Sequence, residues 1–232
     1  MPEAKTISFE RFSSADADLT FCASDNVLFK VHRKNLEVHS EVFGDMFEAA
    51  TKKSEETIGL SEPSAVLEVL FQYMYRQPQP SLDALPFSVC AGVAEAAEKY
   101  LVYSAMTALH AHMRANITRH PLVVLNFAVP HDFATLANDA ARHCLQFPLE
   151  KAVGILRPDV FARWAVFYDK WHREASRVLT IPNVRKWPKY GELENFLRRN
   201  PHRCFTEVDK WNLLRDETDQ LHEMQFVNDV FM

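Results

Sequence analysis

Glycine is scarce in this chain. The sequence has 5 glycines in 232 residues, and the closest two, Gly44 and Gly59, lie fifteen positions apart. Phosphate-binding loops, dinucleotide-binding fingerprints and nucleophile elbows all need two or more glycines within a few residues. The sequence therefore excludes the commonest nucleotide-binding and hydrolase motifs.

Long apolar runs are lacking as well. Residues 122–129 form one of the longest, and Asn126 interrupts it, whereas a membrane-spanning helix needs about 18 continuous apolar residues. Residues 1–12 carry four charged side chains and no apolar block, which is not typical of a signal peptide. We expect no contact with a membrane and a location in the cytoplasm, the nucleus or both.

Cysteine and histidine show no spacing typical of a metal or catalytic site. The four cysteines stand singly along the chain, which favours reduced thiols over disulfides or zinc ligands. His110 and His112 lie two apart on a predicted helix, so their side chains point about 200° apart and cannot share one ion. We predict no catalytic residue, no metal and no cofactor, and a protein that is not an enzyme.

The net charge of -5 is unevenly distributed along the chain. Residues 1–120 have 11 basic and 16 acidic side chains, residues 121–182 have 7 and 6, and residues 183–232 have 8 and 9. The last segment is itself bipolar, since residues 183–205 have six bases against two acids, and residues 206–232 have two bases against seven acids. The basic stretch favours a solvated helix, or a segment that folds back on the acidic end, over a nucleic-acid-binding site.

Residues 19–116 show strand patterns first and helix patterns later. Apolar residues alternate at 19–21 and 29–31 around Asp25-Asn26, which predicts a hairpin. A short strand is expected at 57–60. Short helices are expected at 34–38 and at 41–50, the second with Ser40 as its N-cap. A longer helix should begin after a Ser61 cap and end before the prolines at 78 and 80. Two more helices are expected at 87–99 and from a Ser104 cap to residue 116.

Everything after residue 116 has the pattern of helices. Pro121 and Pro158 each begin a helix at the first turn, the second running to about Leu179, and Asp132 is the expected cap of a helix between them. Residues 181–188 are a predicted linker. A final helix from about Thr206 has a loose apolar stripe at residues 208, 211, 214, 221 and 224 on an otherwise charged surface. Such a stripe must be buried on its own protein or on a partner.

An ordered set of sequence blocks resembles the BTB/POZ domain. The blocks are DLTF at 18–21, FKVHRKNL at 29–36, SEVFGDMF at 40–47, VLEVLFQYMY at 66–75 and AEAAEKY at 94–100. The resemblance implies an α+β fold, with a small sheet flanked by helices, and the later helices are similar to the extensions found in many fungal BTB proteins. The expected organisation is a lead-in at 1–15, the domain at 16–118, an all-helical extension at 119–181, and a linker with a helical tail at 182–232.

The resemblance also implies where partners bind. Asp18 and Arg33 match the positions of a charged pocket in the family, and His32 matches a structural position of the signature, for which a hydrogen-bonded role is favoured over a chemical one. Further candidate interaction residues are Arg76, which begins the proline-rich segment at 76–80, together with Val89 and Trp211.

Two family-specific modes of assembly match this sequence less well. Members that dimerise by exchanging their amino-terminal segment carry a helix before the first signature strand, and residues 1–17 do not have that pattern. Members that bind a cullin scaffold often place a hydrophobic residue and, two positions on, an acid near the start of the helical hairpin, and Val89-Cys90-Ala91 stands there without the acid.

The resulting functional hypothesis is a non-enzymatic protein-interaction module, a scaffold or adaptor that binds other proteins or a second copy of itself. One alternative is a substrate adaptor of a cullin-based ubiquitin ligase. Another is a nuclear, transcription-associated regulator that acts through the basic stretch with Arg198, Arg199 and Arg203.

Overall fold

The computed structural model describes residues 7–49 and 57–179. The chain divides into two compact units between Met113 and Arg114. The domain boundary expected after residue 118 lies a few positions further along and stays a prediction. None of the helices in the described part has the length and apolarity needed to cross a bilayer.

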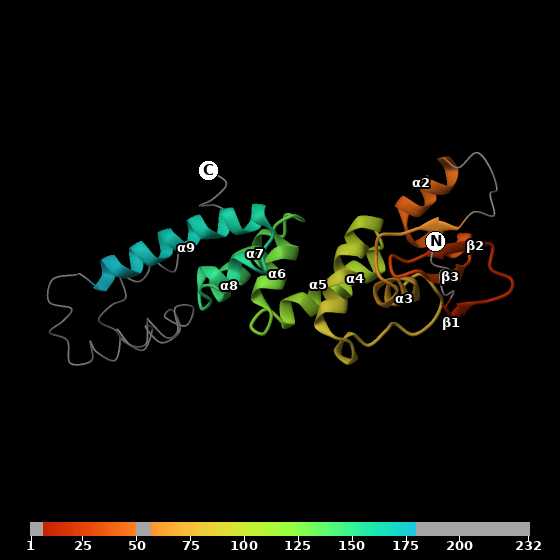
Figure 1. The fold of residues 1–232 in the computed structure, drawn as a ribbon, viewed down its shortest axis with the longest axis horizontal. Helices are drawn as coiled ribbons and strands as arrows, with labels where there is room; N and C mark the ends of the chain where they lie inside the picture. The colour runs from red at the N-terminus through yellow and green to blue at the C-terminus, as the bar shows by residue number, and fades with distance from the viewer. Residues whose placement is uncertain (1–6, 50–56, 180–232) are drawn as a thin grey trace. The chain divides into compact units, whose positions relative to one another are not determined.

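Unit 1 contains a mixed sheet of four short strands in the order β1-β3-β2-β4 (Figure 1). Strands β2 (Leu19–Cys22) and β3 (Val27–Val31) form the predicted antiparallel hairpin, with Leu19 opposite Val31. The turn between them places Asn26 at a φ of 62°, a left-handed conformation that asparagine tolerates well. Strand β1 (Ile7–Ser13) pairs in parallel with β3, and strand β4 (Ile58–Gly59) pairs in parallel with β2.

Strand β1 was not predicted from the sequence, which left residues 1–15 as a lead-in. Phe12 is only 3% exposed, and its ring lies 5.9, 5.7 and 5.5 Å from the rings of Phe29, Phe71 and Tyr75. Arg11 donates a hydrogen bond to the side-chain oxygen of Gln72. Through these contacts β1 belongs to the core of unit 1.

The described helices of unit 1 are α1 (Arg33–His39), α2 (Glu41–Ala49), α3 (Ser64–Gln72), η1 (Leu82–Ala84), α4 (Phe87–Tyr100) and α5 (Tyr103–Ala115), the last of which extends two residues past the unit boundary. Ser40 caps α2 as predicted, because its Oγ accepts a hydrogen bond of 3.1 Å from the Phe43 N–H. The same hydroxyl donates to the Tyr100 carbonyl at 2.5 Å. The sheet and helices enclose fully buried rings at positions 21, 29, 43 and 71.

Two of the predicted serine caps are wrong. Helix α3 begins at Ser64, and the group that accepts its N–H is the distant Asp25 carboxylate, not Ser61. Helix α5 begins at Tyr103, so Ser104 lies inside it and donates to the Tyr73 carbonyl at 3.3 Å. Long-range contacts therefore replace the local caps that the sequence suggested.

The described secondary-structure elements that lie wholly in unit 2 are all helices, namely α6 (Pro121–Ala128), α7 (Ala134–Cys144), α8 (Leu149–Val153) and α9 (Pro158–Leu179). The starts at Pro121 and Pro158 are confirmed, whereas α8 was not predicted. Asp132 was expected to cap α7, but α7 has no side-chain cap and Asp132 lies in the preceding turn at a φ of 56°.

Polar contacts tie the helices of unit 2 together. The buried Trp164 of α9 donates through its Nε1 to the Ala141 carbonyl of α7 at 3.2 Å. The Asn126 side chain of α6 donates to the Ile155 carbonyl at 2.8 Å and accepts from the Arg157 N–H at 2.9 Å. These contacts fix the position at which α9 begins.

Candidate protein-interaction site

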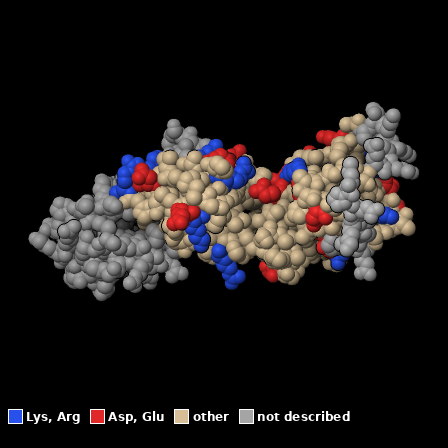
Figure 2. Space-filling model, in the orientation of Figure 1, with Lys and Arg blue, Asp and Glu red and all other residues tan. Residues whose placement is uncertain are grey.

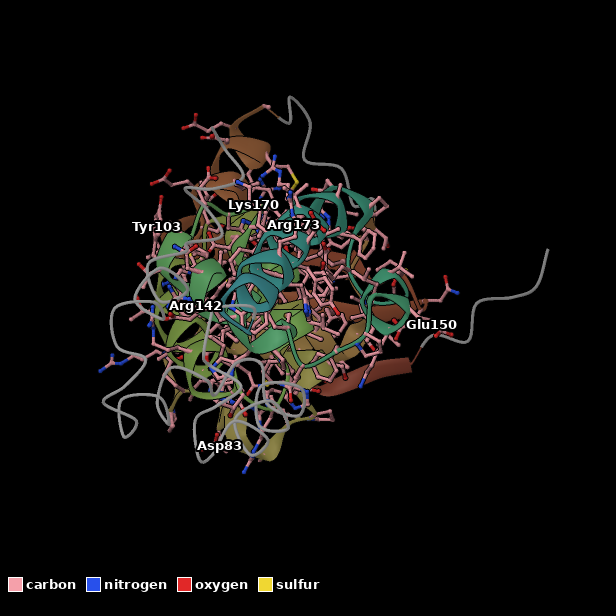
Figure 3. All side chains as sticks on the ribbon, turned by 90° about the vertical axis from the view of Figure 1, so that its left-hand side faces the viewer. Asp83, Tyr103, Arg142, Glu150, Lys170 and Arg173 are labelled. Atoms are coloured by element: carbon pink, nitrogen blue, oxygen red, sulfur yellow. The ribbon has the colours of Figure 1, made fainter. Side chains whose placement is uncertain are left out.

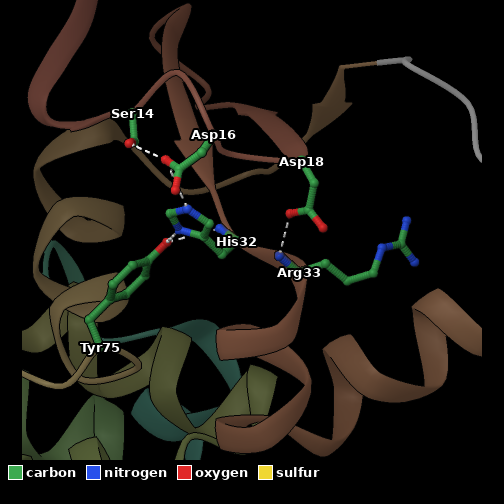
Figure 4. Close-up of polar contacts among 6 residues, drawn as sticks. All are labelled: Ser14, Asp16, Asp18, His32, Arg33 and Tyr75. Atoms are coloured by element: carbon green, nitrogen blue, oxygen red, sulfur yellow. Dashed lines mark hydrogen bonds and ion pairs between the residues drawn. The ribbon is translucent and has the colours of Figure 1, made fainter.

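Asp18 and Arg33 meet at the start of α1, but not as a pair of opposite side-chain charges. The Arg33 backbone N–H donates to Asp18 Oδ1 at 2.8 Å, and Figure 4 shows the guanidinium pointing away from the carboxylate. The guanidinium carbon lies 4.4 Å from the centre of the Phe47 ring, a cation–π contact. Asp18 therefore acts as a helix cap from a distance, and a partner-binding pocket at Asp18 and Arg33 stays a prediction.

His32 is held on both sides by hydrogen-bonding groups (Figure 4). Its backbone N–H donates to the Tyr75 hydroxyl at 2.9 Å, and its Nδ1 lies 3.1 Å from the same oxygen. Its Nε2 lies 3.4 Å from Asp16 Oδ1, while the Ser14 hydroxyl donates to Asp16. His32 is thus hydrogen-bonded in the way the sequence interpretation favoured.

The ionisation states of its neighbours fit this arrangement. Hydrogen bonds from Ser14 and from His32 lower the pKa of the exposed Asp16 carboxyl. Burial raises the pKa of the Tyr75 hydroxyl, so Tyr75 keeps its proton at neutral pH and can donate to His32 while accepting the backbone N–H. Tyr75 was not predicted to take part, although it ends the VLEVLFQYMY block.

Asp25 caps α3 in the same way that Asp18 caps α1. Its carboxylate oxygens accept from the Ser64 N–H at 3.1 and 3.2 Å and from the Ser64 hydroxyl at 2.6 Å. A negative charge at this end of a helix is favoured by the helix dipole. The two aspartates lie just before β2 and in the β2–β3 turn, so one hairpin fixes the starts of two helices.

Glu62 joins α4 to the segment before α3. Its carboxylate accepts from Lys99 Nζ at 2.7 Å and from the Tyr100 hydroxyl at 2.7 Å. Burial raises the pKa of Glu62, but hydrogen bonds from Lys99, Tyr100 and Ser61 outweigh it, and the net pKa is lowered. Burial, with the nearby Glu62 carboxylate, raises the pKa of Tyr100 to about 12. The cluster is therefore ionised on Glu62 and protonated on Tyr100 at neutral pH.

The structure brings three of the predicted interaction residues together, namely Asp18, His32 and Arg33. Arg76 is exposed in the turn after α3, directly after Tyr75, while Val89 is half-buried near the start of α4. Trp211 lies outside the described residues. None of these positions is shown to bind a partner, and their role stays a prediction.

Sequence analysis missed the most exposed apolar side chains of unit 1. Val38 on α1 is 65% exposed and Tyr103 at the start of α5 is 54% exposed. The Tyr103 hydroxyl donates to Glu41 Oε1 at 3.2 Å, so this ring lies beside the first residue of α2. One signal was available, because Val38 follows the buried Leu36 by two positions, which places it on the opposite side of a helix. We call Val38 on α1 and Glu41 on α2, with the Tyr103 side chain that contacts Glu41 from α5, the α1–α2 surface.

The comparison with protein families agrees with this arrangement. The family model of the BTB/POZ domain matches residues 9–117. No curated protein matches the chain. Residues 9–117 therefore resemble the BTB/POZ domain, a protein–protein interaction module, both in sequence and in a small mixed sheet flanked by helices.

Proposed function

We propose that this protein is a scaffold that binds a second copy of itself through the α1–α2 surface of its BTB/POZ-like unit. The observation that carries the proposal is the exposure of Val38, whose exposed fraction is the largest among the described large apolar side chains. A twofold interface uses the same surface on both copies, so Val38 of each copy would be buried in it.

The size of the effect follows from the side chains. Complete burial of a valine contributes about 1.5 kcal/mol, and Val38 is 65% exposed, so each copy in a symmetric contact contributes about 1 kcal/mol. Replacement of Val38 by aspartate removes about 2 kcal/mol in all, which weakens association about thirtyfold. The two like charges that the substitution places in one interface weaken it further.

Charge opposes the same association. Residues 7–49 and 57–113 carry six basic and thirteen acidic side chains. Two copies of unit 1 therefore repel each other electrostatically at separations up to about the Debye length. Added salt screens this repulsion. Association through an apolar contact should therefore strengthen as salt is raised, whereas association through ion pairs should weaken.

Light scattering of the full chain across a range of concentrations tests the proposal. We expect a dimer for the wild type, a monomer for V38D, and no change for V153D, a matched control on the exposed surface of α8 where Val153 is 56% exposed. Equal masses for wild type and V38D at every concentration would contradict it.

The cullin adaptor remains a separate proposal. Val89 is half-buried and Cys90 is fully buried, so this segment offers less apolar surface than Val38 does. Saturable pull-down of a cullin scaffold, lost on substitution of Val89, would reverse this order.

The nuclear alternative depends on Arg198, Arg199 and Arg203, which lie outside the described residues. Salt-sensitive binding to nucleic acid that is lost when these arginines are replaced would support it. We also propose that the protein is located in the cytoplasm, the nucleus or both, which cell fractionation tests, and that its helical extension is related to those of fungal BTB proteins.

A further inference from the structure

The segment between α3 and η1 is exposed with a period of three residues. Within residues 76–81, positions 77 and 80 are half-buried and the other four positions are exposed. A polyproline II helix has three residues per turn, so side chains three positions apart share one edge. The burial pattern therefore matches a polyproline II segment that turns one edge towards unit 1 and two edges outward. We call residues 76–81 the outer segment.

The sequence of the outer segment favours the same conformation. The rings of Pro78 and Pro80 fix φ at about −65°, and the glutamine before each ring is disfavoured from the helical region. Ser81 has a φ of −77° and a ψ of 108°, which is also extended. Within the described part of the chain, the backbone of residues 78–80 makes no hydrogen bond. Its carbonyl oxygens can therefore accept hydrogen bonds from a partner, as they do in polyproline II ligands.

Unit 1 holds both ends of the outer segment in place. At the start, the Gln77 backbone N–H donates to the Tyr75 carbonyl at 2.9 Å, and Gln77 Nε2 donates to the Gln72 carbonyl at 3.1 Å. At the end, η1 begins at Leu82, whose carbonyl accepts from the buried Cys90 thiol at 3.5 Å. A partner therefore binds a segment that is already extended, and loses less conformational entropy than it would with a free peptide.

Arg76 places a positive charge beside the exposed Pro78. Basic side chains are scarce in unit 1, and Figure 2 shows few blue side chains on its visible face. The Asp83 side chain in η1, just beyond the outer segment, is 95% exposed and lies at the lower edge of Figure 3. The carboxylates of unit 1 would repel an acidic partner surface, whereas an aromatic ring can bind the Arg76 guanidinium by a cation–π contact.

We propose that the outer segment binds a small protein domain with one aromatic-lined cleft that takes a single X-Pro pair. Pro78 is on an outward edge and fills the cleft, while Arg76 stacks on an aromatic ring at its rim. Pro80 is on the edge that faces unit 1, so a groove with two X-Pro pockets would leave one of them empty. A WW domain offers one such cleft, whereas an SH3 domain offers two pockets.

Titration of isotope-labelled WW domains with the unlabelled full chain, followed by NMR chemical shifts, tests the proposal. We expect saturable shifts of cleft residues in at least one domain of a panel, at up to about 0.5 mM chain, which detects a Kd as weak as about 1 mM. P78A should weaken this binding about tenfold, because two ring methylenes leave an apolar cleft. R76A should weaken it about threefold.

Three controls make the test specific for the outward edge. P80A should weaken binding by less than about threefold, because this change alters the stiffness of the segment but not the contact. P130A, at an exposed proline of unit 2, should bind as the wild type does. Hydrogen exchange of α3 and α4 should be the same in P78A as in the wild type, which separates loss of binding from loss of fold.

Several results would overturn the proposal. These are no shift with any WW domain, undiminished binding by P78A, equal weakening by P80A and P78A, and binding by an SH3 domain that is as tight as that by the best WW domain. V38D should bind the WW domain as the wild type does, so the proposal can fail or succeed apart from self-association.

Discussion

Removal of the Asp25 carboxylate should destabilise unit 1 through two elements at once. Asp25 lies in the β2–β3 turn and accepts three hydrogen bonds from Ser64, the first residue of α3. Seven of the nine residues of α3 are buried, so the start of this helix positions much of the core. Asp25→Ala leaves the Ser64 N–H and the nearly buried Ser64 hydroxyl without their acceptor.

The magnitude can be assembled from three contributions. Loss of a helix cap costs about 1 kcal/mol, and loss of a negative charge beside the helix N-terminus costs about 0.5 kcal/mol. The unpaired Ser64 hydroxyl, in a residue 9% exposed, adds about 1 kcal/mol. We expect Asp25→Ala to lower the free energy of unfolding by about 2.5 kcal/mol, and Asp25→Asn, which keeps an acceptor oxygen, to lower it by less than half as much.

Hydrogen exchange of the full chain is the suitable assay. The four tryptophans lie at positions 164, 171, 187 and 211, so tryptophan fluorescence reports nothing about unit 1. Slowly exchanging amides of β2 and α3 should lose protection in Asp25→Ala, while those of α6 and α7 keep it. Asp45→Ala, at an exposed position of α2, is the matched control and should change protection by less than about 0.5 kcal/mol. Equal and small effects of Asp25→Ala and Asp45→Ala would refute the capping argument.

Three further predictions concern packing and pH. Trp164→Phe removes the buried hydrogen bond to the Ala141 carbonyl and should lower the free energy of unfolding of unit 2 by about 2 kcal/mol, measured by urea titration of the remaining tryptophan fluorescence. Gly92→Ala places a Cβ 2.7 Å from Val66 Cγ2, so we expect a net loss of about 1 kcal/mol despite the gain in helix propensity, and Val66→Ala in the same chain should relieve the clash. Burial lowers the pKa of His143, so the unfolded chain binds a proton at this residue at higher pH than the folded chain does. Unit 2 should therefore lose stability as pH falls below about 6.5. His143→Gln should reduce the difference in thermal stability between pH 7.5 and pH 5.5.

Local patterns in the sequence predicted most of the elements that the structure contains. The alternation at 19–21 and 29–31 gave the hairpin, and Pro121 and Pro158 marked helix starts, because each signal is complete within a few residues. Ser40 was also assigned correctly, since its acceptor role involves Phe43, three residues away.

The errors arise where distant residues decide the local structure. Ser61 is a residue type that often caps helices, but the Ser64 N–H at the start of α3 donates to Asp25, which lies 39 positions earlier in the sequence. No local sequence pattern predicts a hydrogen bond between residues so far apart. Strand β1 was missed because the core itself, through the rings around Phe12, selects the extended conformation.

The candidate site was predicted unevenly for the same reason. The resemblance located Asp18, His32 and Arg33, but the structure was needed to show that Asp18 binds a backbone N–H and that Tyr75 holds His32. The exposure of Val38 depends on what the rest of unit 1 covers. A helical period indicates that its side differs from that of Leu36, but not whether another element packs against it.

The solution mass of the full chain and of V38D, measured by light scattering as protein and salt concentrations are raised, tests the central claim most directly. Self-association through the α1–α2 surface predicts a wild-type dimer that strengthens with salt, and a V38D monomer under the same conditions. A wild-type monomer throughout, or a dimer that V38D leaves intact, would contradict the claim.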